Sequence, residues 1–82
     1  MTIDELKVIF ILKGYRVPKP MTRGGQAFVA VLPGKIRLEI VFVTSNFITI
    51  TVFGGRWHCT IRCKPEDTFI ELSRNYTRHE FA

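Results

Sequence analysis

The sequence predicts a two-layer α+β fold in which two helices cover one face of a four-stranded antiparallel sheet. Three observations predict this class. A capping pattern opens the chain, four short segments with a period of two occupy its middle, and a proline with two acidic residues precedes a final helical pattern. The predicted order is therefore helix, four-stranded meander, helix, and we expect a single domain over residues 1–82.

The first predicted element is a helix that begins after Thr2 and ends at Lys13 and Gly14. Thr2 and Glu5 have the spacing of a capping box, and glycine commonly ends a helix. One helical face carries Ile3, Leu6, Ile9 and Phe10, and the other side carries Val8, Ile11 and Leu12. A helix that is apolar on both sides is deeply buried or contacts a partner, so we expect Val8, Ile11 and Leu12 to form a protein interface. A strand over residues 8–12 is the alternative, because these residues are β-prone.

Residues 15–26 are predicted to form a loop rich in proline and glycine, with Arg16, Lys19 and Arg23 as its cations. A period of two then predicts strands at 27–32, 36–43, 47–53 and 56–63, and short turns between them predict an antiparallel meander. Pro65, Glu66 and Asp67 are predicted to start the last helix, because proline and acidic residues suit a first turn. That helix has an apolar stripe of Phe69, Leu72 and Tyr76, and residues 77–82 are expected to be a frayed tail.

Segment 56–63, RWHCTIRC, places a tryptophan, a histidine and two cysteines within eight residues. In a strand, Cys59 and Cys63 lie ~13 Å apart on one face, and a disulfide needs Cα atoms within ~7 Å. They are also too far apart to hold one zinc ion readily, and His58 points to the other face. We therefore expect no metal site, and expect both cysteines to be buried beside Trp57.

The opposite face of the predicted sheet is the candidate functional surface, because cations and aromatic rings on an open sheet are typical of single-strand nucleic-acid binding. The net charge of +5 also favours polyanionic partners. The candidate nucleic-acid-binding residues are Arg37, Phe47, Phe53, Arg56, His58, Arg62 and Lys64, with Arg16, Lys19 and Arg23 in the loop. Val41 and Val43 on the same face would equally suit a protein interface.

The other signals argue against catalysis. His58 lies on an exposed face and His79 in the tail, most carboxylates lie at helix starts, and the lysine-serine ending of a phosphate-binding loop is missing. Two cysteines are too few for a disulfide scaffold. The longest apolar run is residues 8–12, whereas a membrane helix needs ~20 residues. We expect a cytoplasmic protein with no catalytic residues, no cofactor, no small-molecule substrate and no membrane partner.

These observations predict a small non-catalytic binding protein that acts on a nucleic acid, preferably single-stranded, or on a nucleoprotein complex. Small basic single-domain chains are frequent among accessory factors of phages and mobile elements, and this association rests on size and composition alone. The alternative is a protein–protein inhibitor or assembly module that self-associates, for example as a homodimer, and blocks a host protein. It would use the first helix or an open edge strand.

Overall fold

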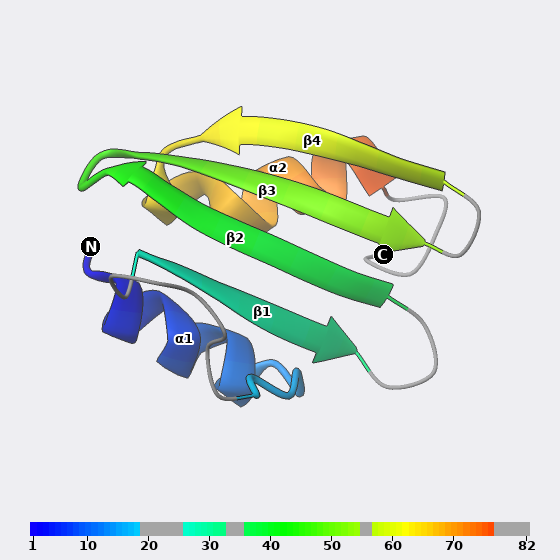
Figure 1. Ribbon diagram of the computed structural model, residues 1–82, viewed down its shortest axis with the longest axis horizontal. Coiled ribbons are helices and arrows are strands. Elements are labelled where there is room, and N and C mark those ends of the chain that lie inside the picture. The colour runs from blue at the N-terminus through cyan, green and yellow to red at the C-terminus, as the bar shows by residue number, and fades with distance from the viewer. Residues whose placement is uncertain (19–25, 33–35, 55–56, 77–82) are drawn as a thin grey trace.

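The fold is given by a computed structural model that describes residues 1–18, 26–32, 36–54 and 57–76, without the side chains of residues 57, 75 and 76. Lys19, Arg23, Arg56 and residues 77–82 lie outside the described residues, as do most of the predicted 15–26 loop and the 33–34 turn. The elements are α1 (Ile3–Leu12), β1 (Ala27–Leu32), β2 (Ile36–Thr44), β3 (Phe47–Gly54), β4 (Trp57–Cys63), a 3₁₀ turn η2 (Pro65–Asp67) and α2 (Thr68–Tyr76) (Figure 1).

The four strands form one antiparallel sheet in the order β1-β2-β3-β4, so every strand pairs with its neighbours in the sequence. β1 and β4 are therefore the edges of this sheet. The predicted α+β class, the meander and the element order are confirmed. On the outer edge of β1, Arg16 and Val31 exchange two backbone hydrogen bonds, each 2.8 Å long between nitrogen and oxygen.

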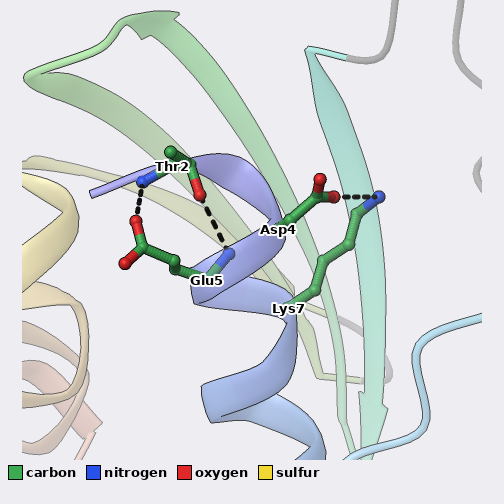
Figure 2. A network of polar contacts seen from close by, with 4 residues as sticks. All are labelled: Thr2, Asp4, Glu5 and Lys7. Atoms are coloured by element: carbon green, nitrogen blue, oxygen red, sulfur yellow. Dashed lines mark hydrogen bonds and ion pairs between the residues drawn. The ribbon is translucent and has the colours of Figure 1, made fainter.

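Helix α1 begins with the predicted capping box. The Thr2 hydroxyl accepts a hydrogen bond from the Glu5 amide at 3.1 Å, and the Glu5 carboxylate accepts one from the Thr2 amide at 2.8 Å (Figure 2). Hydrogen bonding to the carboxylate, first from the Thr2 backbone amide and then from the Thr2 side chain, lowers the pKa of Glu5, because it favours the charged form. The last helical residue is Leu12 and Lys13 is the C-cap, and Gly14 follows with a φ of 94°, a left-handed conformation that suits glycine. The alternative of a strand over residues 8–12 is therefore wrong.

The core lies between the sheet and the two helices. Alternate residues of the strands point into it, because side chains along a strand alternate between two faces. The buried strand residues are Phe28, Ala30, Ile36, Leu38, Ile40, Phe42, Ile48, Ile50, Val52 and Ile61. Leu6 and Phe10 of α1 and Leu72 of α2 join the same cluster, so both helices cover one face of the sheet. In Figure 1, α2 lies behind β3 and β4, and α1 lies along the β1 side.

Phe10 is the residue that connects the two helices and the sheet. Its ring centroid lies 4.7 Å from that of Phe69 in α2, 5.1 Å from that of Tyr15 and 5.7 Å from that of Phe28 in β1. Edge-on and tilted contacts of this kind stabilise an aromatic cluster beyond the burial of area alone. Burial also raises the pKa of Tyr15 to about 12, because the charged phenolate is poorly solvated there.

The final helical segment differs from the prediction in its first turn. Residues 65–67 form a 3₁₀ turn, and the α-helix starts only at Thr68. The Thr68 backbone amide donates to the Pro65 carbonyl, as the three-residue spacing of a 3₁₀ turn requires, and the buried Thr68 hydroxyl donates a further 2.6 Å hydrogen bond to the same carbonyl. Leu72 is buried and Phe69 partly buried, as the predicted stripe requires, whereas the Tyr76 side chain lies outside the described part.

None of the described helices is long and apolar enough to span a membrane.

Candidate nucleic-acid interface

The outer face of the sheet, opposite the helices, is organised in rows that run across all four strands. The register of the strands defines three of them. The rows are Val31, Arg37, Phe53 and His58; then Val29, Glu39, Thr51 and Thr60; then Ala27, Val41, Thr49 and Arg62. Phe47 and Lys64 lie beyond the third row, and Val43 is exposed at an irregularity between Phe42 and Thr44 in β2.

Polarity changes across this face from one edge to the other. The outward residues of β1 are Ala27, Val29 and Val31, and all three are apolar. β3 contributes threonines to the middle of the face, where the Thr51 and Thr60 hydroxyls lie 3.3 Å apart. β4 and the residue after it contribute His58, Arg62 and Lys64, which we call the β4 basic residues. The outer face is therefore apolar along β1 and basic along β4.

The β4 basic residues are all exposed, and within the described part of the chain none of them forms an ion pair with a carboxylate. Arg37 differs, because its guanidinium lies 2.8 Å from the Glu39 carboxylate. A cation that has no carboxylate neighbour can meet an external anion without first losing an internal partner. Arg62 and Lys64 are therefore better placed than Arg37 to contact phosphate groups.

The two outward phenylalanines occupy different environments. Phe53 is half-buried between neighbours from both flanking strands, with the Arg37 guanidinium carbon 5.6 Å from its ring centroid. The His58 ring is stacked against it at 5.9 Å with an interplanar angle of 27°. Phe47, at the other end of β3, is 38% exposed. Phe47 is therefore the ring on which an incoming base could stack, whereas the Phe53 ring already contacts the Arg37 guanidinium and the His58 ring.

A shallow hollow of about 210 Å³ lies on the outer face over β1 and β2. Its lining residues are Ala27, Phe28, Val29, Arg37, Glu39, Ile40 and Val41. The hollow was not anticipated from the sequence, although the alternation within residues 27–32 already places Ala27 and Val29 on the outward side. The hollow is a mainly apolar pocket beside the Arg37–Glu39 ion pair.

The prediction that both cysteines are buried is wrong. Cys59 is exposed and Cys63 is half-buried, and the two are not joined by a disulfide. Alternation determines the face on which a strand residue lies, but burial also requires that something covers that face. β4 is an edge strand with a neighbour on one side only, and among its described side chains (residues 58–63) Ile61 is the buried one. Burial and the nearby Glu71 and Asp67 carboxylates raise the pKa of Cys63 to about 11.

A second exposed surface lies on α1, away from the sheet. Leu6 and Phe10 face the core, whereas Val8, Ile11 and Leu12 are 53%, 54% and 80% exposed. We call these three residues the α1 stripe. Three branched aliphatic side chains on the solvent side of a single helix form an apolar patch of the kind that marks interaction sites.

The structure thus divides the predicted nucleic-acid residues into groups. Arg37, Phe53 and His58 share one row, and Arg62, Lys64 and Phe47 gather toward the opposite end of the strands. Arg16 lies apart from both groups, on the outer edge of β1. Lys19, Arg23 and Arg56 are outside the described residues.

Among the residues that the structure describes, no group of three or more His, Cys, Asp or Glu side chains could hold a metal ion. The features that remain as candidates are the β4 basic residues, Phe47 and the α1 stripe. Comparison of the chain with protein-family models, with curated proteins and with solved structures finds no match.

Proposed function

We propose that this chain is a non-catalytic binding protein that holds an anionic polymer on the outer face of its sheet, with single-stranded nucleic acid as the preferred ligand. One observation carries the proposal: the β4 basic residues are exposed along one strand, and no described carboxylate pairs with them. The net charge of +5 adds long-range attraction for such a polymer.

The arrangement of side chains suggests how a strand would lie. Arg62 and Lys64 would contact phosphate groups along β4, while the bases lie over the β3 threonines, one strand spacing of ~4.8 Å away. Thr49 is the cross-strand partner of Arg62, and the exposed Phe47 ring lies two residues before Thr49 on the same face. Stacking on a ring is tolerant of base identity, so the proposed binding is not sequence-specific.

The salt dependence of binding tests this proposal. For single strands, each phosphate contact contributes about −0.7 to the slope of log K against log salt. Two contacts, from Arg62 and Lys64, give a slope of about −1.4, which is a roughly sevenfold loss of affinity between ~50 and ~200 mM salt. Fluorescence anisotropy with labelled single-stranded DNA, single-stranded RNA and duplex measures this slope. Absence of binding to all three at ~50 mM salt would overturn the proposal.

Two matched pairs of variants locate the surface. Arg62→Gln should reduce the salt slope by about 0.7, whereas Arg74→Gln removes the same charge from α2 and should leave binding nearly unchanged. Arg74 is a suitable control because it is exposed and pairs with Glu71 at 3.1 Å. Phe47→Ala should weaken binding roughly 5- to 150-fold if one base stacks there, and Val43→Ala should not. Equal effects within either pair would mean that another surface binds.

A second candidate function, a protein–protein inhibitor or assembly module, is favoured by a different observation, the exposed α1 stripe. Both functions are compatible with an accessory factor of a phage or mobile element that acts in the cytoplasm on a host nucleoprotein. Co-purification of a defined host complex by the tagged chain, lost in Leu12→Asp and retained in Arg62→Gln, would favour the second function.

A further inference from the structure

We propose that the α1 stripe binds a second copy of this chain, with the two α1 helices packed antiparallel about a two-fold axis. The stripe consists of Val8, Ile11 and Leu12, which are exposed on the side of α1 opposite the core. The inference does not depend on nucleic-acid binding. It rests on the net charge of α1 and on the order of charges along it.

The first observation is that α1, taken with its capping residues Thr2 and Lys13, is electrically neutral in a strongly basic chain. Residues 2–13 contain two carboxylates, Asp4 and Glu5, and two ammonium groups, Lys7 and Lys13. The chain as a whole carries +5, so the entire excess of positive charge lies outside this segment. Two copies of a basic chain repel one another through much of their surface, and the neutral α1 segment does not add to that repulsion.

Charge also separates the α1 stripe from the exposed valines on the outer face of the sheet. Val41 and Val43 on the outer sheet face are 40% and 57% exposed. They share that face with Arg62 and Lys64, which pair with no described carboxylate. A second copy placed there would bring like charges together, whereas a second copy on α1 would not.

The second observation is the order of charges along the helix. α1 begins with Asp4 and Glu5, and its end is followed by two cations, Lys13 and Arg16. The Lys13 ammonium lies 4.7 Å from the Phe69 ring centroid of α2, so Arg16 is the cation left for a second copy. In an antiparallel pair, the acidic start of each helix lies beside the basic end of the other, and the helix dipoles are also opposed. A parallel pair would place like charges together at both ends. Charge complementarity therefore selects the antiparallel arrangement.

The stripe itself is continuous along the helix. Asp4, Val8 and Leu12 are spaced by four residues and Ile11 lies three after Val8, so their side chains are neighbours on one side. Asp4 already pairs with Lys7 of its own helix at 3.7 Å, but its side chain is 86% exposed and remains accessible (Figure 2). In an isologous contact, Val8, Ile11 and Leu12 of one copy would pack against the same residues of the other.

The expected dimer is weak. A standard interface uses roughly 20–30 residues on each side, far more than one helix face supplies. We therefore expect a dissociation constant of roughly 10–500 µM, and a monomer–dimer equilibrium that depends on concentration.

Sedimentation velocity from ~5 µM to ~1 mM, a range that brackets the expected dissociation constant, tests the proposal. The wild-type chain should shift from its 9.5 kDa monomer toward twice that mass. Leu12→Asp should weaken association at least tenfold without changing the thermal midpoint, because Leu12 is 80% exposed. Val43→Asp introduces the same charge on the opposite face and should not weaken the dimer. If Leu12→Asp does not fold, Ile11→Ser decides the same question.

Three results would overturn the proposal. A wild-type chain that stays monomeric throughout the concentration range means that a different molecule covers the stripe. A dimer that persists in Leu12→Asp, or that Val43→Asp disrupts, means that another surface associates. Finally, Asp4→Lys should weaken an antiparallel dimer through repulsion from Arg16 of the second copy, and an equal or stronger dimer in this variant would exclude that orientation.

Discussion

Replacing Phe10 by alanine should remove a large part of the stability of this fold. The Phe10 ring is fully buried and lies within 5.7 Å, between centroids, of rings from α2, β1 and the segment after α1. Truncation of a buried phenylalanine costs about 3–5 kcal/mol in lost burial and cavity formation. Domains are stable by roughly 0.05–0.15 kcal/mol per residue, or about 4–12 kcal/mol for a chain of this length. Phe10→Ala therefore removes from about a quarter to all of the stability expected for a domain of this size.

Urea unfolding, followed by circular dichroism, measures this effect. With a slope near ~1.2 kcal/mol per molar, a loss of ~3 kcal/mol lowers the midpoint by roughly 2.5 M. Leu12→Ala on the same helix is the matched control, because Leu12 is 80% exposed and its truncation should change stability by less than ~0.5 kcal/mol. The measurement should be made at low protein concentration, where association through α1 does not contribute to stability.

The stabilities of Phe10→Ala and Leu12→Ala together test the orientation of α1. If Leu12→Ala destabilises the chain as much as Phe10→Ala, then the helix does not present Phe10 to the core and the α1 stripe to solvent. Both the assignment of the core and the proposed dimer surface would then be wrong. If Phe10→Ala prevents folding altogether, Phe10→Leu keeps most of the buried volume and should give a smaller, measurable loss.

Two further predictions concern the C-terminal half. Thr68→Val should cost about 0.5–1.5 kcal/mol in urea unfolding, because it removes the 2.6 Å hydrogen bond from the Thr68 hydroxyl while the Pro65 carbonyl keeps the Thr68 backbone amide as a donor. Thr68→Ser should recover much of this loss, and equal losses in the two variants would contradict the role of the hydroxyl. Iodoacetamide at pH 8, monitored by mass spectrometry, should label the exposed Cys59 well before Cys63. The pKa of Cys63 is raised to about 11, so its thiol stays protonated at pH 8. Labelling of Cys63 should therefore become faster as the pH is raised toward 11. If Cys63 reacts as fast as Cys59 at pH 8, the half-buried, protonated state of Cys63 is wrong.

The elements of the fold could be predicted because each has a local signal. The capping box at Thr2 and Glu5 and the glycine at position 14 defined α1, and the period of two defined the strands to within about one residue. Proline at 65 indicated the start of the last helical segment. These signals depend on neighbouring residues in the chain, so the sequence contains them directly.

The candidate site could be predicted only in part. It depends on the pairing register between strands and on which parts of the sheet the helices cover. Alternation placed Arg37, Phe53 and His58 on one face, but only the register puts them in one row, where Arg37 and His58 contact the Phe53 ring. The 2.8 Å ion pair between Arg37 and Glu39 likewise depends on side-chain conformations that a pattern does not specify. Exposure of Cys59 depends on which part of an edge strand the helices cover.

The order β1-β2-β3-β4 also has a consequence for the way the chain folds. Each strand pairs with the next strand in the sequence, so every hairpin closes a short loop, and the entropic cost of closure grows only slowly with loop length. The contact between Phe10 and Phe69 is different, because it joins helices from opposite ends of the chain. We expect it to form late, after the sheet is in place, so interactions across it should govern the rate of unfolding more than the rate of folding. The lifetime of the native state then depends on the strength of the packing between α1 and α2, which includes the Phe10–Phe69 contact.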